Sequence, residues 1–258
     1  MDFPIIGIGT YKVKPQPEIN FLLENAFRCG YNMIDTAEIY RNQKYIGAYI
    51  KNIDRSKIWI TSKISFANYK SDNLDEIIKS LNKTFIDLNT DYIDLYLIHC
   101  PIEEWNGKIW NLLRYYQKEG KIRYIGVSNF NYEKLTKFIR EIGPEEAKNI
   151  FCNQIEYNPF LNRKDLIKLC QDNNIKVVAY GSLNKKNDLI EEIAKKLYRT
   201  PEQVLLKWGQ QNGAHIIPMA QDAKYIKDNI CLDFEIPEED MKKMNELNEN
   251  YSRYEKYL

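Results

Sequence analysis

The sequence predicts an α/β fold, a (β/α)8 TIM barrel with eight parallel strands and an outer ring of helices. Eight short apolar runs recur along the chain, and segments with helical periodicity separate them. The runs are nearly continuous rather than alternating, which is typical of parallel strands covered on both faces. No linker rich in Pro, Gly or Ser and no internal repeat divides the sequence, so we expect one domain over residues 1–258.

The predicted strands follow one another at moderate spacing. In order along the chain they are Ile5–Thr10, Asn32–Ala37, Ile58–Ile64, Tyr92–His99, Tyr124–Phe130, Ile150–Tyr157, Lys176–Leu183 and His215–Met219. A doubly wound open sheet is the rival fold, and it usually carries a Gly-rich turn after its first strand. The sequence contains no GxGxxG motif, which favours the barrel.

Helical patterns fill the intervals between these strands. Apolar side chains recur at helical spacing from Ile19 to Phe27, after the first strand. The same spacing recurs from Leu74 to Phe85, after Ser71 or Asp72, either of which could cap that helix. The segment Thr200–Gln203 has the spacing of a capping box, with proline at the first helical position.

Charge and composition exclude several classes of protein. Lys and Arg number 37 and Asp and Glu 36, so the net charge of +1 gives no electrostatic case for nucleic acid or an anionic membrane as partner. No apolar run is long enough to span a bilayer, and the first residues lack the features of a signal peptide. Five scattered cysteines without a CxxC pair and two histidines offer no metal-ligand set. We therefore predict free thiols, no metal and a cytoplasmic location.

Hydrogen-bonding or ionisable residues end seven of the eight predicted strands, a pattern that indicates a functional site. They are Thr10 with Tyr11, Asp35, Lys63, His99, Ser128 with Asn129, Gln154 with Glu156, and Tyr180. The carboxyl ends of barrel strands meet on one face, where the catalytic groups of such folds lie. Taken singly, each residue has a structural alternative: Asp35 as a helix cap, Lys63 extending to solvent, His99 as a core histidine. Together they favour a site, because a buried lysine needs a carboxylate and Asp35 lies one strand away.

Six segments, in this order along the chain, carry a resemblance to a known family. They are GYNMIDTAEIYRNQKYIG, ITSKI, DLYLIH, KEGKIRYIGVSNF, CNQIEYNPFL and KVVAYGSL. They resemble the signature blocks of the aldo-keto reductase family, and LDFEIPEEDMKKMNELN resembles its last helical segment. The similarity extends from Phe3 to Asn248. It implies a monomeric or weakly dimeric (β/α)8 oxidoreductase that reduces small aldehydes and ketones to alcohols with a nicotinamide cofactor.

The resemblance assigns a catalytic tetrad to Asp35, Tyr40, Lys63 and His99. Hydride transfer to a carbonyl carbon leaves an alkoxide that needs a proton, and the resemblance makes Tyr40 its donor. A phenol with an ordinary pKa of about 10 donates slowly near neutral pH unless its anion is stabilised. We expect the Lys63 ammonium to stabilise that anion and Asp35 to hold Lys63 charged. His99 is expected to donate a hydrogen bond to the carbonyl oxygen.

Further matches assign residues to the cofactor. The residues expected at the cofactor are Thr10, Asp35, Ser128, Asn129, Gln154, Tyr180, Gly181, Ser182, Leu183 and Asn229, together with Asp222, whose acidic side chain could select NAD. The hydroxyl and amides of Ser128, Asn129 and Gln154 suit the uncharged nicotinamide carboxamide. Tyr180 matches the aromatic residue that stacks on the nicotinamide ring, and 181–183 matches the pyrophosphate loop.

The adenosine end of the expected site departs from the family pattern. After the last strand the family usually has Ile-Pro-Lys-Ser and then an arginine. This chain has Met219 and Ala220 in place of Lys-Ser, and Tyr225 at the arginine position. A 2′-phosphate, with a charge of about −2, needs Lys or Arg, so its usual donors are missing.

Two cofactors therefore remain open. NADP(H) is expected first, from the family, with Lys224, Lys185 or Lys186 supplying the charge from a shifted position. NAD(H) is the alternative, with Asp222 accepting hydrogen bonds from the free ribose hydroxyl, as acidic residues do in other dinucleotide sites.

Substrate contacts are expected from Tyr11, His99 and Cys100. Cys100 stands where members of the family often have tryptophan, so the pocket should be open and suited to small carbonyl compounds. The last residues, 250–258, are expected to fold over the site or to fray. The alternative function is a catalytically quiet cofactor-binding protein with a regulatory or interaction role on the same fold.

Overall fold

Eight parallel strands form one strongly curled sheet in the computed structural model, which describes residues 1–64, 74–102 and 104–254. The strands are β1 (Ile8–Gly9), β2 (Met33–Asp35), β3 (Trp59–Ile64), β4 (Ile93–Ile98), β5 (Ile122–Ser128), β6 (Ile150–Glu156), β7 (Lys176–Tyr180) and β8 (His215–Ile216). Their order in the sheet is their order in the chain, and every neighbouring pair is parallel. The prediction of eight parallel strands in one α/β fold is confirmed.

The two edges of the curled sheet approach each other without forming a continuous ladder. The Gly7 N–H donates to the Ile216 carbonyl at 2.9 Å, and the Gly9 N–H donates to the Pro218 carbonyl at 2.9 Å. A single isolated bridge joins Ile6 to Ile216. Both edge strands are shorter than predicted, and at Pro218 the reason is that proline has no N–H to donate to a ladder.

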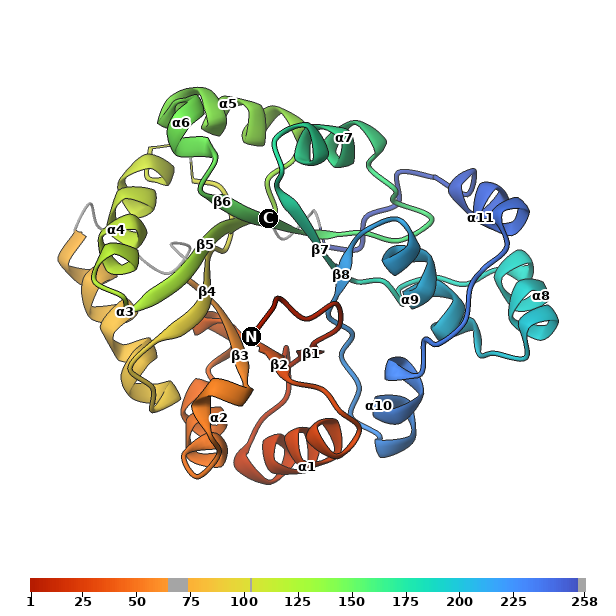
Figure 1. Ribbon diagram of the computed structural model, residues 1–258, viewed down its shortest axis with the longest axis horizontal. Helices are drawn as coiled ribbons and strands as arrows, with labels where there is room; N and C mark the ends of the chain where they lie inside the picture. The colour runs from red at the N-terminus through yellow and green to blue at the C-terminus, as the bar shows by residue number, and fades with distance from the viewer. Residues whose placement is uncertain (65–73, 103, 255–258) are drawn as a thin grey trace.

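Helices surround the sheet on its outer side (Figure 1). They are α1 (Gln16–Arg28), η1 (Glu38–Tyr40), α2 (Gln43–Ile50), η2 (Arg55–Lys57), α3 (Leu74–Leu88), α4 (Asn106–Lys118), α5 (Tyr132–Ile142), α6 (Pro144–Ala147), α7 (Lys164–Asp172), α8 (Asp188–Leu197), α9 (Pro201–Gln211), α10 (Ala223–Ile230) and α11 (Glu238–Asn245). The capping box at Thr200 is present: its hydroxyl accepts from the Gln203 N–H at 3.2 Å, and the Gln203 side chain accepts from the Thr200 N–H at 2.9 Å. The caps predicted at Ser71 or Asp72 lie outside the described residues.

Aromatic side chains fill the amino-terminal end of the curled sheet. Phe3, ahead of β1, lies 4.9 Å from the Trp59 ring and 4.1 Å from the His215 ring, measured between centroids. Tyr124 and Phe151 pack beside them at 4.3 Å. This packing closes one end of the sheet, so a ligand must approach from the carboxyl end.

No helix in the described ranges is long and apolar enough to cross a membrane.

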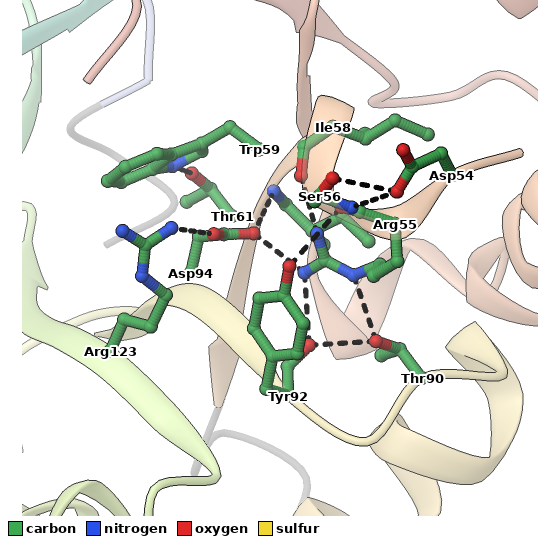
Figure 2. A network of polar contacts seen from close by, with 11 residues as sticks. Asp54, Arg55, Ser56, Ile58, Trp59, Thr61, Thr90, Tyr92, Asp94 and Arg123 are labelled. Carbon is green, nitrogen blue, oxygen red and sulfur yellow. Dashed lines mark hydrogen bonds and ion pairs between the residues drawn. The ribbon is translucent and has the colours of Figure 1, made fainter. Parts of the chain in front are cut away.

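An ion-pair network joins three strands near this closed end (Figure 2). Asp94, near the start of β4, accepts from Arg55 Nη2 at 2.6 Å and from the Ile60 N–H at 2.9 Å through Oδ2. Its Oδ1 accepts from Arg123 Nη1 at 2.8 Å. Only 2% of the Asp94 side chain is exposed, so its charge depends on these donors. The network links β3, β4 and β5 far from the carboxyl ends of the strands.

We predict that Asp94→Asn lowers the free energy of unfolding by about 3 kcal/mol, because two guanidinium groups lose their shared buried carboxylate. Urea unfolding measures the loss. The control is Asp172→Asn, which removes a solvent-exposed pair with Lys168 four residues away and should cost about 0.5 kcal/mol or less. Equal losses in the two variants would contradict the structural role of Asp94.

Candidate functional site

A buried ion pair lies at the carboxyl end of the sheet. Lys63, in β3, donates from Nζ to Asp35 Oδ1 at 2.6 Å and to the Thr36 carbonyl at 2.9 Å. The Lys63 side chain is 0% exposed and that of Asp35 is 4% exposed. The same ammonium lies 3.5 Å from the Tyr40 hydroxyl. Three of the four tetrad residues predicted from the sequence therefore meet at one point.

Tyr40 reaches this point because a buried amide fixes its loop. Asn42, which is 0% exposed, accepts from the Thr36 hydroxyl at 2.8 Å through Oδ1. Its Nδ2 donates to the Thr10 carbonyl at 2.8 Å and to the Val13 carbonyl at 3.1 Å. Asn42 thus ties the turn carrying Tyr40 to the loop after β1. No pattern in the sequence indicates this role, because an asparagine before a helix is usually a cap.

His99 directly follows β4 and places its ring beside the phenol. The His99 and Tyr40 rings meet edge to face, with centroids 5.8 Å apart. The His99 Nδ1 is buried and finds no hydrogen-bond partner among the described residues. Burial, and then the charge of Lys63, lower the pKa of His99 to about 3. The imidazole is therefore neutral near pH 7.

Burial also sets the protonation of the phenol and the ammonium. The pKa of Tyr40 is raised well above its ordinary value, chiefly by burial and next by the Asp35 carboxylate. The pKa of Lys63 is lowered by burial, which Asp35 opposes by favouring the ammonium. Tyr40 consequently keeps its proton at neutral pH.

The polar residues predicted for the carboxamide join the tetrad through hydrogen bonds. Gln154 Nε2 donates to Asp35 Oδ2 at 2.8 Å, and Asn129 Nδ2 donates to the His99 carbonyl at 2.8 Å. The Tyr180 hydroxyl donates to Asn129 Oδ1 at 2.7 Å. Ser128 donates to the Gln154 carbonyl at 2.9 Å. This set of amides and hydroxyls beside the Tyr180 ring fits a nicotinamide carboxamide in its chemistry.

Glu156, at the end of β6, anchors the C-terminal residues at the site. Glu156 is only 2% exposed. Its carboxylate accepts hydrogen bonds from the Ser252 hydroxyl at 2.6 Å, the Arg253 N–H at 3.0 Å and Asn184 Nδ2 at 2.8 Å. The expectation that the tail folds over the site is met for residues 250–254, and residues 255–258 lie outside the described ranges. The sequence placed Glu156 at a strand end without giving it a partner.

The remaining predicted residues lie around this cluster. Tyr11 is 42% exposed, with its ring 5.1 Å from that of Tyr40, and Cys100 is half-buried next to His99. Ser182 is buried in the loop after β7, and its hydroxyl donates to the Tyr157 carbonyl at 3.3 Å.

Asp222 precedes α10 as its N-cap and Asn229 lies within α10, at the expected adenosine end. Asp222 uses its carboxylate to accept from the Lys224 N–H at 2.8 Å as a helix cap. The lysines considered for a 2′-phosphate are each paired: Lys186 with Glu202 and Lys224 with Asp228, both pairs near the surface. Lys185 pairs in the same way, with Glu249.

Comparison with known proteins identifies relatives along nearly the whole chain. The model of the Aldo/keto reductase family matches residues 5–185. Glyoxal reductase of Bacillus subtilis (strain 168) is 33% identical over 257 residues, which cover 97% of this chain and 91% of that protein. Methylglyoxal reductase DkgB of Yersinia pestis is 34% identical and covers 89% of this chain and 87% of its own. The crystal structure of an aldo/keto reductase from Brucella melitensis has a TM-score of 0.87 at 30% identity, over 95% of both chains.

We predict that protonation of His99 makes the unfolding free energy depend on pH between 6.5 and 5. The folded-state pKa of about 3 lies below the ordinary 6.5, so the unfolded chain binds the proton first as the pH falls. The stability contributed by neutral His99 is present above pH 6.5 and is lost progressively toward pH 3. Between pH 6.5 and 5 the protein should lose roughly 1–2 kcal/mol more than the His99→Gln variant, measured by urea unfolding. Identical losses would show that His99 is not desolvated.

Proposed function

This chain belongs to the aldo/keto reductase family, and on that premise we propose that it reduces small aldehydes and ketones at Asp35, Tyr40, Lys63 and His99. The observation that carries the proposal is the position of the Lys63 ammonium, 2.6 Å from Asp35 Oδ1 and 3.5 Å from the Tyr40 hydroxyl. These three polar groups come from separate strands and loops, and the packing of a hydrophobic core does not require them to be buried together. Together they form a proton donor with a fixed positive charge beside it.

The proposed proton donor is Tyr40 Oη. A reduced nicotinamide, when bound, would supply the hydride for the carbonyl carbon. Tyr40 Oη would then give its proton to the developing alkoxide oxygen and become a phenolate. The raised pKa of Tyr40 keeps that proton in place until the alkoxide forms. The Lys63 ammonium lies close enough to stabilise the phenolate left behind, and Asp35 holds the ammonium in position.

His99 is proposed to orient the carbonyl group. A neutral imidazole has one N–H donor, which can hydrogen-bond the carbonyl oxygen without giving up its proton. The lowered pKa of His99 keeps the ring in this neutral form. Its edge-to-face packing on Tyr40 brings the two proposed donors close together.

The cofactor is proposed to lie across β5, β6 and β7. Ser128, Asn129 and Gln154 would hold the carboxamide, Tyr180 would stack on the ring and residues 181–183 would face the pyrophosphate. We infer further that the curled sheet closes into the (β/α)8 barrel of the family, supported by the backbone hydrogen bonds between its edges. A site across three strand ends needs this curvature.

NADP(H) is the proposed cofactor form, with NAD(H) as the alternative. The ammonium groups of Lys186 and Lys224 are bound to carboxylates, but these surface ion pairs are worth about 0–1 kcal/mol. A phosphate can therefore replace either carboxylate at small cost. The relatives named glyoxal reductase and methylglyoxal reductase support a small dicarbonyl or aldehyde as substrate.

Replacing the proton donor tests the reaction. Tyr40→Phe should lower kcat/KM for methylglyoxal reduction by about 10²–10⁴-fold, the contribution expected from general acid catalysis. Fluorescence titration should show that the variant still binds the cofactor. Tyr115→Phe, at a tyrosine that is 59% exposed on α4, is the matched control and should leave both values unchanged. Cofactor binding without any carbonyl reduction in the wild type would favour the catalytically quiet alternative.

Titration of the wild type with NADPH and NADH tests the cofactor form. We expect tighter binding of NADPH, and a variant with Lys185, Lys186 and Lys224 all changed to Ala should lose affinity for NADPH alone. NADH serves as the internal control because it lacks the 2′-phosphate. Tighter binding of NADH than of NADPH by the wild type would contradict the proposal of NADP(H) and favour NAD(H) as the cofactor.

A further inference from the structure

The Glu156 carboxylate is buried without a cation among its hydrogen-bond donors in the described part of the chain. Its donors are the Asn184 amide, the Ser252 hydroxyl and the backbone N–H groups of Arg253 and Tyr254, the last at 3.4 Å. Three of these four donors come from the C-terminal segment, about a hundred residues further along the chain. A buried carboxylate is costly unless such donors satisfy it, so the segment 252–254 is fixed where β6 ends.

This anchoring brings the Tyr254 ring onto the loop that ends β7. The rings of Tyr254 and Tyr180 meet edge to face, with centroids 5.6 Å apart. Gly181 has a φ of +64°, and a β-carbon there would lie 3.3 Å from Tyr254 Cε2 and 2.6 Å from Asn184 Nδ2. Only a glycine permits so close an approach in this backbone conformation. The β7 loop is therefore shaped to receive the tail.

The surfaces that the tail covers are those assigned above to the cofactor. Tyr180 is the proposed stacking ring, and Gly181 begins the proposed pyrophosphate loop. The Tyr180 hydroxyl donates to Asn129 Oδ1 at 2.7 Å, so it occupies an oxygen that is proposed to bind the carboxamide. The docked tail and the tyrosine together close the nicotinamide side of the site.

We propose that residues 252–254 form a strap, anchored by Glu156, that competes with the nicotinamide cofactor for Tyr180 and Gly181. Cofactor binding displaces Tyr254 and releases the Tyr180 hydroxyl from Asn129, and the strap closes again after the cofactor leaves. Glu156 is thus a positioning residue that acts through the tail. The inference rests on the proposed function, because it requires the cofactor to bind at this place.

Tail variants test the strap by cofactor binding. A chain ending at Tyr251 and the variant Tyr254→Ala should bind NADPH with a Kd about tenfold lower than wild type, the factor expected if the strap is docked in about nine-tenths of free molecules. Glu156→Gln should shift the Kd in the same direction, because a neutral amide holds the tail donors less strongly. Tyr198→Ala, at a tyrosine that is 93% exposed directly after α8, is the matched control and should bind as the wild type does.

Limited proteolysis measures how accessible the strap is with and without the cofactor. Trypsin should cleave the wild type after Arg253 faster when the cofactor is saturating, because the displaced tail is then accessible. If Glu156→Gln does not fold, the Kd values of Tyr254→Ala and of the shortened chain still test the strap. Equal or weaker cofactor binding by these two variants, with normal binding by the wild type, overturns the strap alone. Failure of the wild type and the shortened chain to bind either NADPH or NADH overturns the proposed function and the strap with it.

Discussion

The buried ion pair between Lys63 and Asp35 is the interaction on which the site depends. Moving both charges out of water costs several kcal/mol for each ion, so the pair persists only with further hydrogen bonds. The Thr36 carbonyl accepts from Lys63, and Gln154 donates to the second oxygen of Asp35. Asp35 lies in β2, Lys63 in β3 and Gln154 in β6, and Thr36 directly follows β2, so the pair holds its place only while the sheet keeps its curvature.

The two ends of the sheet distribute their charges in different ways. At the amino end, both oxygens of the buried Asp94 carboxylate accept hydrogen bonds, from two arginines and a backbone N–H. At the carboxyl end, Lys63 is shared between Asp35 and the more distant Tyr40, and the His99 Nδ1 lacks a partner among the described residues. The first arrangement stabilises the fold, whereas the second leaves groups that can change partners during a reaction.

Much of the fold and of the polar cluster around Lys63 could be predicted from the sequence, because strand ends in a parallel sheet share one face. The apolar runs placed Asp35, Lys63 and His99 on that face, and the signature blocks added Tyr40. Asn42 could not be found in this way, because its role depends on three carbonyl and hydroxyl partners that only the folded loop assembles. The sequence placed Glu156 at a strand end, but its hydrogen-bond partners could not be predicted, for a similar reason. Its partners lie near the C-terminus, and no local pattern indicates a contact across so long a stretch of chain.

The hydrogen bonds within the site also explain why the tail should matter for cofactor affinity. Asn129, Gln154 and Tyr180 already use their polar atoms on one another or on the tetrad. A carboxamide that binds there exchanges these hydrogen bonds for new ones, so its net gain per bond is small. In the proposed arrangement, ring stacking on Tyr180 and the phosphate contacts would then provide most of the binding energy. Because Tyr254 packs on the Tyr180 ring, the proposed strap would oppose the cofactor at the contact that contributes most to its binding.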